Sequence, residues 1–365
     1  MQEQVHFFKY DGKEIPVTYD FENIQDRLQE CNCVIDLFLD YLKEKNIVFT
    51  EEEKKLLIAD ESIATSYIEG YETWLIPYFL VQECKCKGLA ERATISCYNS
   101  YLYSLEKYKG ENINDIDSIL DIWKKLVSYK RLFIKRIRKS SVRVGNRMVT
   151  THVAPPAKYV KSLLGDMFDS LQRYSKKSED KYGLISPILF HYLYTFIHPF
   201  LDGNGRSARM IEQIMIKNTN NFDFVIPFSD IILEDRKSYY KTFKSGQTFG
   251  DGPTDVLSIN LDDFINYNLY TIEKGFIILL SVIERKIEFT DLDDIDFEGL
   301  FNDLIENKFG FFKISREKVK ERLNDNIIYC KCLLSGKFKE KDGKIEIFSV
   351  LNNDILSSIN IKEMF

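Results

Sequence analysis

The sequence predicts a mostly α-helical protein with a few short β-hairpins. Between residues 20 and 275, apolar residues recur at helical spacing in most segments. The β-rich segments are short and are interrupted by turn-forming pairs, namely Asp11-Gly12 and Gly145-Asn146. With 365 residues, of which 44% are hydrophobic and 14% aromatic, the chain can build a sizeable core. We therefore expect two or three mainly helical domains.

The N-terminal segment predicts a hairpin followed by helices. FFKYDGKEIPVTY (7–19) has β-rich flanks around an Asp-Gly turn. A helix is then expected from Asp20, with apolar residues at Phe21, Ile24, Leu28, Cys31, Ile35, Phe38 and Leu42. Thr50 and Glu53 form a capping box, which predicts a second helix running to Glu69 and ended by Gly70.

The middle of the chain predicts more helices and one further hairpin. The expected elements are helices near 89–108 and 115–128, a hairpin at 141–153 ended by Pro155-Pro156, a helix near 157–173, and a buried helix at 185–197. A glycine-containing loop follows, and the next helix is expected to begin near Arg206.

Beyond about residue 275 the composition changes. An acidic run is followed by a short expected helix at SREKVKERL and a hairpin around Asp342-Gly343, which is compatible with a winged-helix module. Because this region has more acids than bases, a structural or protein-contact role is favoured over DNA binding. The expected division is residues 1–110 (N-terminal helical region), 111–275 (central domain) and 276–365 (small C-terminal α+β module).

Charge and hydropathy exclude several classes of partner. The formal net charge of −6 argues against a nucleic-acid or acidic-membrane partner, because both require a basic surface. No apolar run approaches the length of a membrane span, and the N-terminus lacks the apolar block of a signal peptide. These features predict a cytoplasmic protein with no membrane partner. Its seven cysteines are then expected to be reduced and packed as small apolar residues.

HPFLDGNGRSAR (198–209) combines the groups needed to bind a nucleotide and to transfer a group from it to a nucleophile. Gly203 and Gly205 open a helix whose N–H groups can hold phosphate oxygens. Asp202 makes sense in an anion site if it holds Mg²⁺, which turns the acid into a ligand. Arg206 and Arg209 can each grip a phosphate with forked donors. His198 titrates near neutrality and suits a general base.

This motif resembles the HPFx(D/E)GN(G/K)RxxR signature of the Fic family at every defined position. The usual activity of that family is to transfer AMP from ATP to a protein hydroxyl. The resemblance extends over roughly residues 60–265 and implies a Fic-type helical core with a β-hairpin flap. Gly205 and Arg209 favour AMP transfer over phosphorylation. Family members that phosphorylate tend to have lysine at the position of Gly205 and no arginine at the position of Arg209.

The resemblance assigns a role to each residue of the loop. It implies that His198 deprotonates the target hydroxyl and that Asp202 binds Mg²⁺ between the α- and β-phosphates. The remaining implied contacts are Asn204 with the N–H groups of Gly203 and Gly205 at the α-phosphate, Arg206 at the β-phosphate, Arg209 at the γ-phosphate, and Phe200 as an anchor in the core.

Two other segments are similar to parts of the family. The hairpin at 141–153 would be the flap that aligns a target segment by strand addition, with Val149, Thr150, Thr151 and His152 beside the nucleotide. The alternative is an ordinary surface hairpin. Tyr239-Tyr240 resembles a tyrosine pair whose first member contacts adenine. Gln247 stands where many members have asparagine, so the adenine end of the nucleotide-binding site is less defined.

TSYIEG (65–70) resembles the (S/T)xxxE(G/N) inhibitory motif of Fic proteins that carry an N-terminal inhibitory helix. The implied mechanism pairs Glu69 with Arg209, while Thr65 fixes the helix through a hydrogen bond and Gly70 ends it. ATP would then bind with its α-phosphate misaligned. Without the signature at 198–209, Glu69 would be interpreted as a solvated acid at the end of a helix.

The predicted function is a Mg²⁺-dependent protein adenylyltransferase that acts on a Ser, Thr or Tyr hydroxyl of a target protein or of itself. Two alternatives are open: hydrolysis of AMP from a modified protein, and nucleotide binding without turnover. ATP is the expected co-substrate. The identity of the target is left open, as is the oligomeric state, for which a homodimer is one option. His6 is expected to lie in a terminal strand without a functional role, and His191 is expected to be a core residue with satisfied hydrogen bonds.

Overall fold

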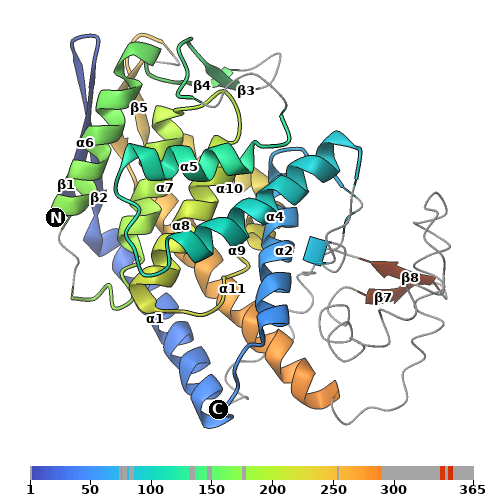
Figure 1. The fold of residues 1–365 in the computed structure, drawn as a ribbon. Helices are drawn as coiled ribbons and strands as arrows, with labels where there is room; N and C mark the ends of the chain where they lie inside the picture. Colours follow the sequence, from blue (N-terminus) through green and yellow to red (C-terminus); the bar gives the residue numbers. More distant parts are fainter. Residues whose placement is uncertain are drawn as a thin grey trace. The chain divides into compact units, whose positions relative to one another are not determined.

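The computed structural model describes residues 2–73, 75, 80–81, 86–130, 136–145, 150–174, 178–252, 255–289, 338–341 and 344–347. The chain divides into two compact units, Met1–Glu273 and Lys274–Phe365. The first unit is mainly helical and contains one four-stranded sheet and one separate hairpin (Figure 1). The predicted mostly α-helical class is confirmed, whereas the division at residues 110 and 275 stays a prediction.

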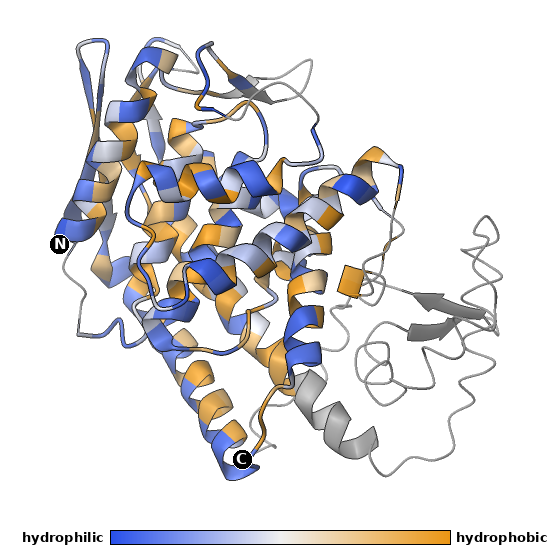
Figure 2. Ribbon diagram, in the orientation of Figure 1, coloured by the Kyte–Doolittle hydropathy of each residue, from blue (hydrophilic) through white to orange (hydrophobic). Residues whose placement is uncertain are grey.

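The N-terminal hairpin forms as predicted. Strands β1 (Gln2–Tyr10) and β2 (Lys13–Asp20) are antiparallel and are joined by Asp11 and Gly12, whose φ values are both positive. Asp20 then caps helix α1 (Phe21–Glu44), because its side chain accepts a hydrogen bond from the Glu22 N–H. Hydrophilic and hydrophobic residues alternate along α1, as expected for a helix with one face on the core (Figure 2).

Helix α2 (Glu51–Ile68) starts and stops at the residues that the sequence indicated. Thr50 and Glu53 form the complete capping box, with the Thr50 N–H donating to Glu53 Oε2 at 2.7 Å. Glu69 is the C-cap and Gly70 follows with a φ of +79°. Most of α2 is buried, and its buried residues include polar ones. The helix is therefore positioned to place polar side chains inside the first unit.

The other elements described in the first unit are helices, one hairpin and two sheet strands. They are α4 (Leu89–Lys107), α5 (Ile116–Leu126), β3 (Arg143–Gly145), β4 (Thr150–Val153), the 3-10 turn η1 (Ala157–Tyr159), α6 (Val160–Arg173), α7 (Ile185–Ile197), α8 (Asn204–Asn220), α9 (Phe228–Glu234), α10 (Arg236–Ser245), β5 (Gln247–Phe249), β6 (Val256–Asn260) and α11 (Asp262–Phe289), which continues past the unit boundary. Helices α7 and α8 pack together within the helical part of this unit (Figure 1).

The four-stranded sheet was not expected from the sequence. Its strand order is β1-β2-β6-β5, so strands from both ends of the first unit lie side by side. Strand β6 pairs with β2 in parallel, with Val17 opposite Ile259. A local pattern can indicate each strand but not this pairing, because the two strands are far apart in the chain.

Helix α8 begins at Asn204 rather than near Arg206 as expected. Gly203 adopts a left-handed conformation (φ +83°) and acts as the N-cap, so the helical turn starts one residue later. A side chain at Gly203 would also crowd Trp123 and Val127, whose atoms lie 3.4 and 3.3 Å from an ideal Cβ position. The start of α8 therefore requires glycine at this position for both conformation and space.

In the second unit the structure describes a hairpin of β7 (Phe338–Lys341) and β8 (Lys344–Ile347), which is the one expected around residues 342–343. The helix expected at SREKVKERL, and with it the winged-helix interpretation, lies outside the described residues. None of the helices in the described ranges combines the length and the hydropathy needed to cross a membrane.

His6 lies in the terminal strand β1, as expected, where it is buried and links the sheet to α6. Its Nδ1 lies 2.8 Å from Ser170 Oγ, and its ring packs edge-on against Phe8. Burial, helped by the positive charge of Arg173, lowers the pKa of His6 from 6.5 to about 4. The neutral imidazole is therefore the form that the fold accommodates.

This shift predicts a pH dependence of stability. A histidine whose folded pKa is depressed stabilises the fold above its unfolded pKa, and this contribution is lost as the pH falls from 6.5 to about 4. We expect the free energy of unfolding of the wild type to fall by up to about 3 kcal/mol more than that of His6→Gln over this range. Denaturant unfolding at several pH values measures the difference. Parallel pH profiles for the two proteins would contradict the assignment.

Candidate active site

The loop between α7 and α8 begins with a histidine in an unusual conformation. His198 is the C-cap of α7 and has φ 52° and ψ 62°, the left-handed region that non-glycine residues rarely occupy. Its N–H donates to the Tyr194 carbonyl at 3.0 Å, and its side chain is partly exposed. Such backbone strain is found most often at functional sites and persists only where the surroundings hold it.

Contacts from two helices fix the rest of the loop. Phe200 is fully buried and stacks on Trp123 of α5, with ring centroids 4.0 Å apart and planes 8° apart. The Asn204 side chain accepts from the Phe200 N–H (3.0 Å) and donates to the Phe200 carbonyl (2.8 Å). Trp123 Nε1 donates to the Asp202 carbonyl at 2.7 Å. The loop is thus anchored to α5 and closed onto α8.

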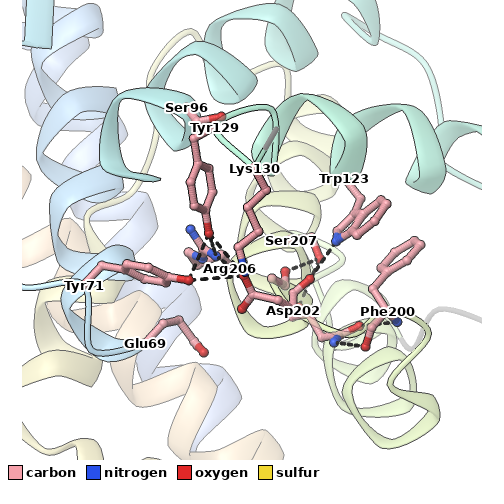
Figure 3. Close-up of polar contacts among 12 residues, drawn as sticks. Glu69, Tyr71, Ser96, Trp123, Tyr129, Lys130, Phe200, Asp202, Arg206 and Ser207 are labelled. Atoms are coloured by element: carbon pink, nitrogen blue, oxygen red, sulfur yellow. Dashed lines mark hydrogen bonds and ion pairs between the residues drawn. The ribbon is translucent and has the colours of Figure 1, made fainter. Parts of the chain in front are cut away.

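Four donors converge on one oxygen of Asp202, as Figure 3 shows. Asp202 Oδ2 lies 2.6 Å from Lys130 Nζ, 3.1 Å from the Tyr129 hydroxyl, 3.2 Å from the Tyr71 hydroxyl and 3.3 Å from Arg206 Nη2. Burial by itself would raise the pKa of Asp202, but the charges of Arg206 and Lys130 outweigh it and lower the pKa. The carboxylate therefore stays ionised, as a metal ligand must.

Arg206 is fully buried beside this carboxylate. Its Nη2 donates to Tyr129 and Asp202, and its guanidinium carbon lies 4.5 Å from the centre of the Tyr71 ring. Within the described part of the chain, Arg206 Nε and Nη1 have no hydrogen-bond partner. Buried donors without partners are unfavourable, so these two N–H groups are suited to an anion that enters the site.

Arg209 lies one turn further along α8 and is held by the end of α2. Its Nε donates to Thr65 Oγ1 at 2.7 Å, and its Nη2 pairs with Glu69 Oε1 at 2.7 Å. The Arg209 side chain is inaccessible to solvent, whereas 26% of the Glu69 side chain is exposed. A Cβ at Gly205 would lie only 2.3 Å from Glu69 Oε1, so the carboxylate sits directly against the start of α8.

Comparison with known proteins identifies the domain that carries this site. Residues 113–216 match the model of the Fic/DOC family. This segment, which contains the whole 198–209 motif, is similar to the Fic domain. Part of the chain is 30% identical over 142 residues to the protein adenylyltransferase Fic of Nematostella vectensis, covering 39% of this chain and 30% of that protein. It is also 31% identical over 126 residues to protein adenylyltransferase fic-1 of Caenorhabditis briggsae, covering 34% and 22%. The matched segments therefore span less than a third of these relatives.

Solved structures agree on the fold. A Fic family protein from Desulfovibrio desulfuricans G20 superposes with a TM-score of 0.57 at 18% sequence identity, covering 88% of this chain and 92% of that chain. Fic-1 (residues 134–508) from C. elegans superposes with a TM-score of 0.52 at 20% identity, covering 72% and 74%. At these identities the similarity establishes the Fic fold of the chain and nothing finer.

Tyr239 of α10 is buried behind Arg209. The Tyr239 hydroxyl accepts from Arg209 Nη1 at 3.1 Å and lies 2.9 Å from His191 Nε2. His191 Nδ1 lies 2.7 Å from Glu212 Oε2, so both ring nitrogens are engaged, as expected for a core histidine. Gln247 Nε2 donates to the Tyr192 hydroxyl at 3.1 Å. Adenine contacts for Tyr239 and Gln247 stay predictions.

The hairpin expected at 141–153 is present in the structure. Strand β3 pairs with β4 in antiparallel fashion, with Val144 opposite His152 and Gly145 opposite Thr150. Thr151 lies between these residues in β4, while Val149 lies outside the described residues. The role of the hairpin in aligning a target stays a prediction.

Several residues around the motif were missed from the sequence alone. Tyr71, Trp123, Tyr129 and Lys130 all contact Asp202, but none of them belongs to a recognisable motif. The Lys130 position, four residues after the last residue of α5, carries no signal that would mark it in advance. The side chain of Asn204, assigned to the α-phosphate, is bonded to Phe200 at both of its polar atoms, and its phosphate role stays a prediction.

The Asn204 contacts predict a measurable cost. Asn204→Ala should lower the free energy of unfolding by about 2 to 3 kcal/mol, because the buried N–H and carbonyl of Phe200 each lose a partner. Asn266→Ala is the matched control, since it removes one exposed bond to the main chain and should cost less than about 1 kcal/mol. Chemical denaturation measures both values. If both variants lose the same free energy of unfolding, water molecules replace the hydrogen bonds of the Asn204 side chain to the Phe200 main chain.

Proposed function

We propose that the protein transfers AMP from ATP to a Ser, Thr or Tyr hydroxyl of a target protein or of itself. The observation that carries this proposal is the convergence of two buried arginines, Arg206 and Arg209, with the ionised Asp202 at the start of α8. A triphosphate would supply the anionic oxygens for which Arg206 has two unpartnered donors among the described residues. The names of the curated relatives support adenylyl transfer as the reaction.

The chain's own groups would divide the reaction between positioning and proton transfer. Arg206 would hold the β-phosphate, Arg209 would hold the γ-phosphate once it is released from Glu69, and the N–H groups at the start of α8 would face the α-phosphate. His198 would take the proton from the target hydroxyl as the oxygen attacks the α-phosphorus, and pyrophosphate would leave. The β3–β4 hairpin would present the target segment.

A magnesium ion fits the donor set at Asp202. Among the described residues no group of three or more His, Cys, Asp or Glu side chains could form a complete protein cage for a metal. Mg²⁺ in nucleotide sites is usually held by one or two carboxylates together with substrate phosphates, so a single acid is sufficient. Asp202 would be that ligand after Lys130 is displaced, and the chemistry supplied there would be neutralisation of phosphate charge.

Glu69 would restrain this activity by competing with the γ-phosphate for Arg209. The ion pair engages Nη2 of the guanidinium, which is the donor that a phosphate would need. A triphosphate bound without Arg209 would lack its anchor at the far end, and its α-phosphate would be misaligned for attack. The end of α2 would therefore set the basal rate of transfer.

Removing the carboxylate should raise that rate. We expect Glu69→Gly to increase AMP incorporation into protein at least about tenfold, since coupling between sites commonly amounts to 1 to 3 kcal/mol. Incubation with ATP labelled at the α-phosphate, followed by mass spectrometry for AMP on Ser, Thr and Tyr, measures the change. Glu72→Gly, which removes an exposed acid three residues further on, is the matched control and should leave the rate unchanged.

The same assay separates the proposed function from its alternatives. Incorporation by Glu69→Gly should disappear when His198→Ala is added, because the base is then missing. Labelled protein that persists without His198 would contradict the assigned role of the histidine. Absence of any incorporation in Glu69→Gly, together with intact nucleotide binding, would identify a binding module without turnover.

Hydrolysis of AMP from a modified protein is a second candidate. The observation that favours it is the partly exposed Glu69 carboxylate lying directly over Gly205, where it could orient a water molecule. Release of AMP from labelled protein by the wild type, lost in Glu69→Gly, would identify this activity.

The inhibitory segment also contacts the metal ligand. Tyr71, two residues after Glu69, donates to Asp202 and covers Arg206 with its ring. Tyr71→Phe should therefore bind a non-hydrolysable Mg²⁺–ATP analogue at least about threefold more tightly, because one hydrogen bond that competes with the ligand is removed. Isothermal titration calorimetry measures the affinity. Tyr67→Phe is the control, since the Tyr67 hydroxyl donates to the Thr73 carbonyl instead. If the wild type and Tyr71→Phe bind the analogue with the same affinity, the Tyr71 hydroxyl does not compete with the ligand for Asp202.

A further inference from the structure

Arg138 is a buried arginine that no motif of the sequence marks. Only 2% of its surface is exposed, and it precedes the β3–β4 hairpin by five residues. Each of the four hydrogen bonds that its guanidinium makes within the described part of the chain ends on a main-chain carbonyl oxygen. Burial lowers the pKa of its guanidinium. A buried cation without a carboxylate partner is costly, which indicates that the surrounding structure requires it.

One group of these bonds fixes the turn at His198. Arg138 Nε donates to the His198 carbonyl at 2.7 Å, and Nη2 donates to the Ile197 carbonyl at 3.2 Å. The Arg138 N–H donates to the Pro199 carbonyl at 2.9 Å. Arg138 therefore contacts three consecutive carbonyls at the negative end of α7, where a cation is favourable. These contacts hold the left-handed conformation that sets the direction of the imidazole.

The other group fixes the base of the hairpin. Arg138 Nη1 donates to the Ser140 carbonyl at 3.0 Å, and Nη2 also donates to the Pro155 carbonyl. These two residues flank β3 and β4, and the Ala154 N–H closes the same end by donating to the Val142 carbonyl at 3.2 Å. A single planar guanidinium thus joins both ends of the hairpin to the turn at His198.

We propose that Arg138 is a positioning residue that holds the target-aligning hairpin and His198 in one fixed geometry. This inference rests on the proposed transfer reaction, in which a hydroxyl presented by the hairpin must reach the imidazole. Arg138 acts through main-chain contacts and touches neither nucleotide nor target. Lysine cannot replace it, because one ammonium group lacks the planar fork that reaches carbonyls on opposite sides.

The kinetic test uses the Glu69→Gly protein as the parent, so that transfer is measurable. Adding Arg138→Lys should lower kcat for AMP transfer at least about tenfold and change KM for ATP less than about threefold, because positioning of the hydroxyl is lost while phosphate contacts remain. Guanidinium ion at millimolar concentration should restore part of the rate to an Arg138→Ala variant and none to the parent. Arg136→Lys, which changes an exposed arginine of the same segment, is the control.

Hydrogen exchange tests the same inference without any activity. Arg138→Lys should speed exchange in peptides covering both 194–200 and 151–156, while α6 keeps its protection. Two exchange results would overturn the linking role: faster exchange throughout the first unit, or faster exchange in only one of the two segments. In the kinetic test, an unchanged kcat on adding Arg138→Lys to an active Glu69→Gly parent would overturn it as well. If the Glu69→Gly parent transfers no AMP, the proposed function fails, and the exchange pattern still decides whether Arg138 joins hairpin and loop.

Discussion

The geometry of the site depends on one buried guanidinium, that of Arg209. It is the point at which α2, α8 and α10 meet, because its donors reach Thr65 and Glu69 at the end of α2 and Tyr239 in α10. The cost of removing a cation from water must be offset by hydrogen bonds and opposite charges. Removal of a buried cation's only partner is therefore strongly destabilising. Here Thr65 and Tyr239 remain when Glu69 leaves. In the proposed mechanism, Arg209 would therefore exchange a carboxylate for a phosphate while the two other contacts keep it in the core.

The charge of the site explains why the end of α2 is suited to a restraining role. Three cations, Lys130, Arg206 and Arg209, face two carboxylates, Asp202 and Glu69. With Glu69 in place the cluster carries one excess positive charge, and with Glu69 withdrawn it carries two, which favours a polyanionic ligand. Because 26% of the Glu69 side chain is exposed, solvent weakens its ion pair relative to a fully buried one. The partly solvated Glu69 is therefore the partner that can be displaced.

Local sequence signals were sufficient for much of this fold. The Asp11-Gly12 turn, the capping box of Thr50 and Glu53, and the glycine at 70 each act over a few residues, and each was confirmed. The Fic motif likewise keeps its groups together, because its residues are neighbours in the chain. What could not be predicted depends on contacts between distant segments. The pairing of β2 with β6 is one example, and the contact of Lys130 with Asp202 is another.

Contacts between distant segments also explain how the 198–203 loop can be held rigidly while the end of α2 regulates ligand binding in the proposed mechanism. The loop between His198 and Gly203 is held by the indole N–H of Trp123, the Asn204 amide and the Arg138 guanidinium, all from buried residues. These contacts fix main-chain atoms, and none of them involves the end of α2. The groups proposed to hold phosphates or the metal are instead bound through side chains, to Tyr71 and Glu69. Movement of that helix end could therefore change ligand binding while the loop that carries His198 keeps its conformation, which separates the control of the reaction from its chemistry.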